Sequence, residues 1–234
     1  WFLQLLHRWG AKVVGIALPP ETDSLYTAIN GDALCVYAYT QDINDAEAVK
    51  DIITNHQPDF IFHFAAQALV RPSYEDPIGT FSTNVMGTIH VLDAMRQLNK
   101  TCIGVMITTD KVYENNETGE AFKETDHLGG YDPYSASKAA CEIAISSYIN
   151  SFFNPATYHL HQKSIVSLRA GNVIGGGDMA KDRILPDIVR AIKKNEAVAI
   201  RNPNAVRPWQ LVLEPLIAYA HIGAKLVTDP KLYQ

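Results

Sequence analysis

Short apolar runs alternate with stretches of helical periodicity along most of the chain. Two of the runs, 59–66 and 102–108, are apolar almost throughout, which is typical of strands covered on both faces. The alternation predicts an α/β protein with a doubly wound parallel sheet. The predicted strands are residues 12–18, 33–39, 59–66, 102–108, 164–169 and 197–200, and the predicted helices are residues 1–9, 44–56, 80–98, 185–194 and 214–227, with one more that opens at Asp132-Pro133.

The texture of the sequence changes after Gly171, where three consecutive glycines, 175–177, follow within a few residues. We therefore expect a sheet domain over residues 1–170 and the incomplete start of a smaller substrate-binding lobe over residues 171–234. The chain opens at Trp1 in the body of a helix that has no start signal. On that ground we expect the sequence to be a fragment that was cut inside an element.

Composition narrows the class of protein. Hydrophobic residues make up 47% of the chain and charged residues 19%, which favours a folded protein over a disordered one. Twenty basic residues against twenty-five acidic ones give a net charge of −5, the wrong sign for a partner that is nucleic acid or an anionic membrane. The longest charge-free stretch, 143–162, is interrupted by asparagine, proline and histidine, so we expect no membrane span.

The three cysteines lie far apart, in apolar surroundings and without a CxxC motif. They indicate buried thiols in a reducing compartment, and we expect a cytoplasmic protein. His159 and His161 have no carboxylate partner at ligand spacing, so we expect no metal site. The cysteines are Cys35, Cys102 and Cys141.

Polar or small residues follow the predicted strands at three places. In doubly wound sheets a ligand binds beyond the carboxyl ends of the strands, so these exits are the expected site. The exits are Ala65-Ala66-Gln67, the run 108–111 (Thr-Thr-Asp-Lys) and Gly171-Asn172.

Tyr134 and Lys138 stand four positions apart at the start of the helix that Asp132-Pro133 opens. This spacing places them on one helical face, where an ammonium favours the phenolate and lowers the pKa of tyrosine from about 10. The tyrosine then becomes a usable acid or base near neutral pH. The motif alone is also compatible with an exposed helical pair, so its weight depends on what surrounds it.

Thr109 gives the Tyr-Lys motif this further support. Its hydroxyl at a strand exit can share a hydrogen bond with the same substrate alcohol as Tyr134. Together the three residues resemble the Thr/Ser, Tyr and Lys of the short-chain dehydrogenase/reductase family, in its extended branch that modifies nucleotide sugars. The resemblance covers almost the whole chain and implies a Rossmann-like fold. The stretches that carry it include 62–68 (FHFAAQA), 83–88 (TNVMGT), 107–113 (ITTDKVY), 132–138 (DPYSASK), 169–178 (RAGNVIGGGD) and 207–215 (RPWQLVLEP).

The resemblance implies that NAD is the cofactor. The glycine-rich turn that binds its pyrophosphate in this family would lie upstream of Trp1, so the sequence leaves open whether the fragment alone holds NAD. The cofactor-binding residues that the resemblance implies are Asp42, Ile43, Phe64, Ala65, Ala66 and Gln67, together with Tyr134 and Lys138.

The resemblance further implies a redox-neutral 4,6-dehydration of a nucleotide sugar, with CDP-glucose as the implied substrate. Tyr134 would take the proton of the sugar 4-hydroxyl, Thr109 would orient that hydroxyl, and Lys138 would hold the tyrosine deprotonated. Asp110 and Lys111 are the expected acid and base of water loss, which requires both to be buried beside the substrate. Lys111 could instead only stabilise the enolate, and the pair could be a solvated turn.

Asn172, Arg183 and Arg207 are the expected contacts of the nucleotide-sugar diphosphate, since guanidinium groups bind phosphate oxygens in a fork. The resemblance also implies a homo-oligomer, because the helix of residues 80–98 and the one that bears Tyr134 often pair across subunits in this family. Two alternatives stay open. One is a 4-epimerase that uses Thr109, Tyr134 and Lys138 only, and the other is a non-catalytic dinucleotide-binding module.

Overall fold

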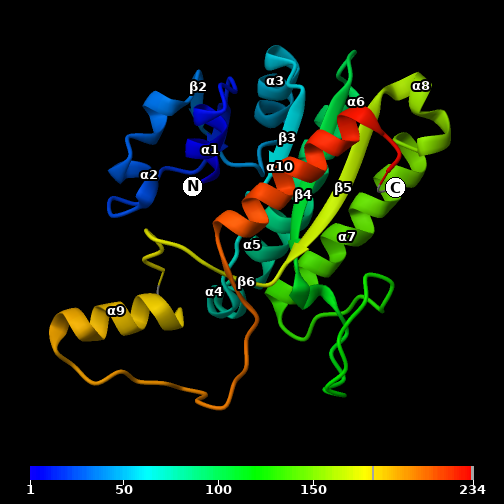
Figure 1. The fold of residues 1–234 in the computed structure, drawn as a ribbon. Coiled ribbons are helices and arrows are strands. Elements are labelled where there is room, and N and C mark those ends of the chain that lie inside the picture. Colours follow the sequence, from blue (N-terminus) through cyan, green and yellow to red (C-terminus); the bar gives the residue numbers. More distant parts are fainter. Residues whose placement is uncertain (181, 233–234) are drawn as a thin grey trace. The chain divides into compact units, whose positions relative to one another are not determined.

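A computed structural model describes residues 1–180 and 182–232 (Figure 1). Its internal contacts divide the chain into two compact units. The first comprises Trp1–Tyr39 and Gly171–Leu216, and the second comprises Thr40–Ala170 and Ile217–Gln234. The expected functional division into residues 1–170 and 171–234 stays a prediction.

The second unit is built on a parallel sheet in the order β3-β4-β5. Its strands are β3 (Phe60–His63), β4 (Cys102–Thr109) and β5 (Lys163–Ala170). The central strand β4 is buried almost throughout, because strands lie on either side of it and helices cover both faces of the sheet. The three strands confirm the parallel sheet that the apolar runs predicted.

Helices cover both faces of this sheet, as a doubly wound fold requires. On one face the rings of Phe60 and Phe62 lie under α10 (Leu213–Thr228), where a Cβ added to Gly223 would approach both rings to about 3.5 Å. On the other face His63 bonds Thr88 of α6 (Gly87–Arg96). Figure 1 shows α10 crossing the strands, with α7 (Pro133–Phe152) alongside β5. The remaining helical elements of this unit are α3 (Ala46–His56), α4 (Val70–Glu75), α5 (Pro77–Phe81), the π-helical turn η2 (Ser82–Met86), the 3₁₀ turns η3 (Asp110–Val112) and η4 (Pro155–Thr157), and α8 (Tyr158–His161).

The first unit holds two small sheets. In one, β1 (Val14–Ala17) lies beside β2 (Tyr37–Thr40), and in the other β6 (Asn172–Ile174) pairs in parallel with β7 (Trp209–Leu211). Within this unit the Trp1 indole donates to the carbonyl of Gly176, 2.8 Å away. Its helical elements are α1 (Phe2–Arg8), α2 (Leu25–Ala28), the 3₁₀ turn η1 (Gly31–Leu34) and α9 (Ile184–Lys194).

Three predicted elements need correction. Residues 197–200 form no strand; they are largely exposed, and no strand lies beside them. The predicted strand 33–39 begins as a 3₁₀ turn and becomes extended only at Tyr37. The single helix predicted over 80–98 is α5, a π-helical turn and α6 in succession. The strands β6 and β7 were missed, because three residues are too few to show a period.

The start of α7 forms as predicted. The Asp132 carboxylate accepts from the backbone amide of Ser135 at 3.0 Å and from its hydroxyl at 2.7 Å, and Pro133 follows at the first helical position. An aspartate in this place satisfies helix amides that would otherwise lack a partner. It therefore fixes where the first turn of α7, with Tyr134, begins.

Replacing Asp132 by alanine should lower the free energy of unfolding by about 1 kcal/mol, because the amide of Ser135 loses its acceptor. Urea denaturation measures the change. Asp45→Ala, which removes the equivalent cap of α3, serves as the matched control and should cost a similar amount. A loss at Asp132 of only a few tenths of a kcal/mol would contradict the capping role.

Candidate active site

Thr109 is the last residue of β4 and is buried. Its hydroxyl lies 3.2 Å from a carboxylate oxygen of Asp110 and 3.4 Å from the backbone amide of Lys111, which donates to it. The chain then turns sharply through η3, so Thr109, Asp110 and Lys111 form one tight turn at the carboxyl end of the strand. We call these three residues the exit turn.

Tyr134 and Lys138 lie on the first two turns of α7, and both are buried. The amide of Tyr134 donates to the hydroxyl of Ser73 in α4 at 3.1 Å. The ammonium of Lys138 donates to the carbonyl of Ile107 in β4 at 3.1 Å. These two bonds hold the start of α7 against α4 and against the end of β4.

The structure brings the exit turn and α7 together. The ammonium of Lys111 lies 5.8 Å from the centroid of the Tyr134 ring, within the range of a cation–π contact. Lys111 is exposed, although we expected it to be buried. That expectation assumed a site in which bound substrate covers Lys111. Asp110 is half-buried. The five candidate catalytic residues thus lie together at the carboxyl end of the sheet.

Burial lowers the pKa of Lys138 from its usual value, and the neighbouring Cys141 and Glu142 act in the opposite direction. The ammonium of Lys138 therefore lies in an apolar environment between α7 and the sheet. His63 lies in the same interior, and burial together with the charge of Lys138 lowers its pKa to about 3. At neutral pH the imidazole is accordingly uncharged.

The hydrogen bonds around His63 fix its tautomer. The hydroxyl of Thr88 donates to the carbonyl of Asn84 at 2.6 Å, so it can only accept from His63. Nε2 of His63 therefore carries the proton and donates at 3.0 Å. His63 is therefore a satisfied interior residue. Among residues 1–180 and 182–232 no group of three or more His, Cys, Asp or Glu could hold a metal.

Apart from Tyr134 and Lys138 on α7, the expected cofactor-binding residues lie at two places in the second unit. Asp42 accepts from both the amide and the side chain of Asn44 and so shapes the turn before α3. The side chain of Ile43 is buried against Gly87, and its carbonyl accepts from Nδ1 of His90 at 2.8 Å. The remaining ones follow β3: Phe64, whose ring is 5.9 Å from that of Tyr219, and Ala65, Ala66 and Gln67.

A buried polar network that sequence reasoning missed joins the exit of β3 to α7. Asn84, inside the π-helical turn, accepts from the Gln67 amide at 2.8 Å and donates to the Gln67 carbonyl at 3.0 Å. Its amide nitrogen also donates to the hydroxyl of Ser137, one turn after Tyr134, at 2.8 Å. The sequence carried a signal, since Asn84 lies within the stretch 83–88 used for the resemblance, but no role was assigned to it.

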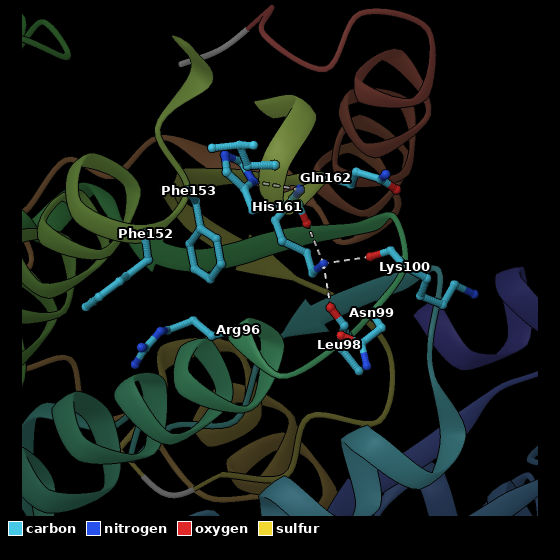
Figure 2. A pocket seen from close by; sticks show the side chains of 10 residues that line it. Arg96, Leu98, Asn99, Lys100, Phe152, Phe153, His161 and Gln162 are labelled. Carbon is cyan, nitrogen blue, oxygen red and sulfur yellow. Dashed lines mark hydrogen bonds between the residues drawn. The ribbon is translucent and has the colours of Figure 1, made fainter. Parts of the chain in front are cut away.

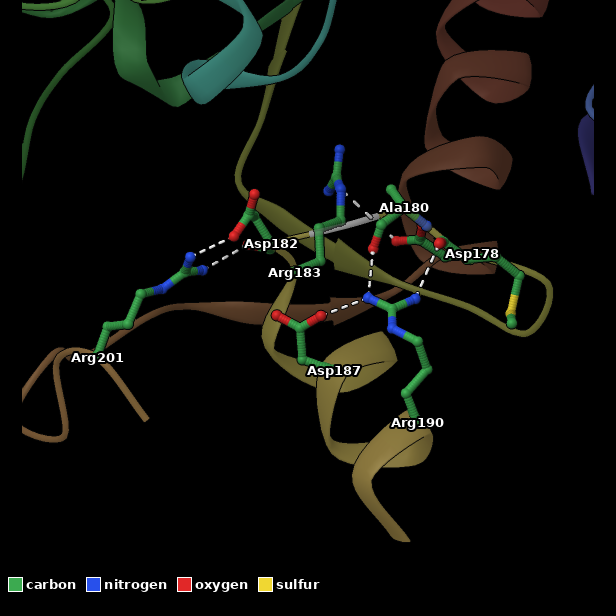
Figure 3. A network of polar contacts seen from close by, with 8 residues as sticks. Asp178, Ala180, Asp182, Arg183, Asp187, Arg190 and Arg201 are labelled. Carbon is green, nitrogen blue, oxygen red and sulfur yellow. Dashed lines mark hydrogen bonds and ion pairs between the residues drawn. The ribbon is translucent and has the colours of Figure 1, made fainter. Parts of the chain in front are cut away.

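The expected substrate-binding residues belong to the first unit. Asn172 begins β6. Arg183 precedes α9 and pairs with Asp178 at 3.7 Å, while Arg207 is exposed and donates to the carbonyl of Val206. Figure 3 shows that the neighbouring arginines are held more tightly: Arg190 donates to the carbonyl of Ala180 and to Asp187, and Arg201 to Asp182.

A cavity of about 370 Å³ lies at the amino end of the sheet, where β4 and β5 begin (Figure 2). The ammonium of Lys163 beside it donates to three carbonyls, those of Leu98, Lys100 and His161, at 2.6–2.9 Å. All three protons of this buried lysine therefore have protein acceptors. The cavity contains none of the candidate catalytic residues.

The fold is that of the extended short-chain dehydrogenases/reductases, as solved structures show. A UDP-glucose 4-epimerase from Thermus thermophilus in complex with NAD superimposes with a TM-score of 0.78 and 27% identity, covering 95% of this chain and 70% of the other. A double mutant of dTDP-glucose 4,6-dehydratase from Streptomyces venezuelae, with NAD bound, has the same fold, with a TM-score of 0.78 at 21% identity over 94% of this chain and 67% of the other. These matches confirm the predicted fold class.

Residues 1–224 match the family model of the GDP-mannose 4,6 dehydratases, and the chain belongs to this family. It is 47% identical over 230 residues to the CDP-glucose 4,6-dehydratase of Salmonella typhimurium, covering 98% of this chain and 64% of that protein. A dTDP-glucose 4,6-dehydratase of Xanthomonas campestris is 28% identical, with 92% of this chain and 62% of the relative covered. The chain thus spans less than two thirds of these relatives' length.

Replacing His63 by glutamine should reduce the acid sensitivity of the fold. The unfolded histidine titrates near 6.5 and the folded one near 3, so between these values only the unfolded state binds the proton and stability falls as the pH falls. From pH 7 to 4.5 the wild type should lose roughly 2–3 kcal/mol more unfolding free energy than His63→Gln. Urea denaturation at both pH values measures the difference.

The exposed His127, replaced by glutamine, serves as the control and should leave the pH dependence of stability unchanged. Identical pH dependence in His63→Gln and in the wild type would contradict a buried, neutral His63.

Proposed function

We propose that the protein is a CDP-glucose 4,6-dehydratase, a lyase that converts CDP-glucose to CDP-4-keto-6-deoxyglucose with NAD as cofactor. The 47% identity to the Salmonella enzyme of that name supports the substrate. The observation that carries the reaction type is the position of Lys111, 5.8 Å from the Tyr134 ring, because it places the exit turn beside the Tyr-Lys pair. A 4-epimerase has no need of an additional acid and base at that place.

The residues at the end of the sheet fit the nicotinamide end of NAD. Lys138 is buried, and within the described chain its ammonium has one hydrogen-bond acceptor, Ile107, which leaves protons for the hydroxyls of a ribose. Ala65 and Ala66 after β3 have small side chains that let a ligand approach the backbone. Bound NAD would supply a hydride acceptor for carbon 4 and, once reduced, a hydride donor for carbon 6, so that the overall reaction would be redox-neutral.

The first half of the reaction needs a base at the 4-hydroxyl. Tyr134, as a phenolate, accepts that proton and becomes a phenol, while the hydroxyl of Thr109 forms a hydrogen bond to the same sugar hydroxyl and so orients it. The charge of Lys138, one helical turn below, favours the phenolate. The product of this half is a ketone at carbon 4, which acidifies the hydrogen on carbon 5.

The second half removes water across carbons 5 and 6. Lys111, as a free amine, takes the proton from carbon 5, and the electron pair of that bond forms the double bond as the bond from carbon 6 to oxygen breaks. Asp110 protonates the departing hydroxyl, which leaves as water, and Lys111 returns its proton to carbon 5 when hydride is added at carbon 6. Asp110 and Lys111 are consecutive in η3, so one turn presents both groups.

The other parts of the proposal concern the substrate's phosphates and the cellular setting. Asn172, Arg183 and Arg207 would contact the diphosphate, with the guanidinium groups as forks for its oxygens. We propose a homo-oligomer in the cytoplasm, acting in deoxysugar and lipopolysaccharide synthesis. Cys102 and Cys141 are buried free thiols, which suits a reducing compartment. No helix in the described residues is long and apolar enough to cross a membrane.

Incubation of the full-length protein with NAD and CDP-glucose should yield a keto sugar that absorbs in alkali. Tyr134→Phe should reduce its rate of formation by about 10²–10⁴-fold, because the base at the 4-hydroxyl is lost. Tyr131→Phe, at a fully exposed tyrosine three residues earlier, is the matched control and should leave the rate unchanged. Formation of an epimer alone would favour the epimerase, and no change in either nucleotide would favour a binding module.

Asp110→Asn should separate the two halves of the reaction. We expect dehydration to slow by about 10²-fold, because nothing protonates the departing hydroxyl. Lys111 can still remove the proton from carbon 5, so CDP-glucose recovered from deuterium oxide should carry deuterium there. Mass spectrometry of the recovered nucleotide measures this. Asp59→Asn, at the opposite end of the sheet, is the control; equal dehydration rates in Asp110→Asn and wild type would remove Asp110 from the mechanism.

A further inference from the structure

One ion pair in the interior contacts both ends of the segment that contains the exit turn. Glu142 lies on α7, one helical turn beyond Lys138, and is buried. Its carboxylate accepts from Nε of Arg169 at 2.8 and 3.0 Å, and also from Nη2. It further accepts from the hydroxyl of Thr108 at 2.6 Å, immediately before the exit turn.

The other side of the Arg169 guanidinium contacts the chain that leaves the exit turn. Its Cζ lies 4.7 Å from the ring centroid of Tyr113, which in turn stacks on Phe122 with centroids 4.6 Å apart and planes within 2°. Nη1 of Arg169 donates to the carbonyl of Glu124 at 3.2 Å. One guanidinium therefore contacts both the residue after η3 and the loop beyond it.

That loop, residues 114–128, returns to its own starting point. Tyr113 and Leu128 form an antiparallel bridge, the Glu114 amide donates to the carbonyl of His127, and the Gly129 amide donates to that of Val112. Holding Tyr113 therefore holds the base of the loop as well. Outside these contacts the loop is largely exposed.

From these contacts we propose that Glu142 and Arg169 are positioning residues for water loss: they clamp the segment 108–113 at both ends and so set Asp110 and Lys111 against Tyr134. The inference rests on the proposed dehydratase activity. Neither residue contacts the exit turn's own carboxylate or ammonium, so the pair acts through Thr108 and Tyr113. A buried ion pair contributes little net stability compared with apolar side chains. Its bidentate geometry, however, fixes orientation on both of its sides.

Arg169→Lys tests the proposal, because lysine keeps the charge but cannot form the fork or stack on Tyr113. In the full-length protein with CDP-glucose we expect kcat to fall about tenfold with KM within about twofold, since a small misplacement of the acid and base slows chemistry more than binding. Deuterium at carbon 5 of the substrate should slow the variant more than the wild type. Trypsin should cleave after Lys123 in the loop about tenfold faster.

Arg96→Lys is the matched control. Arg96 pairs with Asp93 at 2.5 Å and lies 3.9 Å from the ring centroid of Phe152, so it has the same two kinds of contact at a distance from the exit turn. It should leave the four measurements unchanged. Tyr113→Leu removes the stacking contact while Glu142 and Arg169 stay paired, and it should reproduce the kinetic and proteolytic changes even if Arg169→Lys fails to fold.

The outcomes separate this inference from the proposed function. If the wild type does not dehydrate CDP-glucose, the proposed function fails, and the cleavage rate after Lys123 still tests whether Arg169 holds the loop. If the wild type is active and both variants retain its kcat, its isotope effect and its cleavage rate, the positioning role is overturned. An equal fall in the rates of oxidation at carbon 4 and of water loss, with no rise in the carbon-5 isotope effect, would likewise overturn it.

Discussion

The buried ammonium of Lys138, on the second turn of α7, is the charge on which the other charged groups of the candidate active site depend. A charge taken out of water is costly unless polar groups compensate it. Here the Ile107 carbonyl accepts one hydrogen bond, and Glu142, one turn along the same helix, supplies an opposite charge nearby. Glu142 is balanced in its turn by Arg169. The charges of Lys138, Glu142 and Arg169 thus alternate in sign away from the site. The neutral state of His63 follows from its burial first and from the charge of Lys138 second.

The backbone around this lysine is arranged to hold one helix end in one place. The Asp132 cap fixes where α7 begins, the Ser73 hydroxyl holds the amide of Tyr134, and Asn84 ties Ser137 to the exit of β3. The π-helical turn around Asn84 interrupts the regular bonding of the helix and turns its side chain toward these partners. Each of these bonds acts on the first two turns of α7, where the candidate catalytic side chains are.

Local patterns predicted the parts of this arrangement that are themselves local. Asp132-Pro133 predicted the start of α7, apolar runs predicted β4 and β5, and the spacing of Tyr134 and Lys138 predicted their common face. The stretch 83–88 marked Asn84, but the partners of Asn84 and the clamp of Glu142 and Arg169 could not be predicted, because both join residues that are distant in sequence. The hydrophobic periodicity of a segment does not indicate which distant residue it will contact. The strand wrongly predicted at 197–200 has the same cause, since a short apolar run becomes a strand only when another strand lies beside it.

The two ends of the sheet differ in what they can offer a ligand. At the amino end, beside the cavity, Lys163 is saturated by three carbonyls, Lys100 is paired with Asp59, and Arg96 is paired with Asp93. Those cations serve the fold, because binding an anion there would require breaking bonds already made. At the carboxyl end Lys111 is exposed beside Tyr134, and the ammonium of Lys138 has one acceptor within the described chain. Hydrogen-bonding capacity, rather than hollow volume, therefore marks the carboxyl end as the place where a polar ligand gains most by binding.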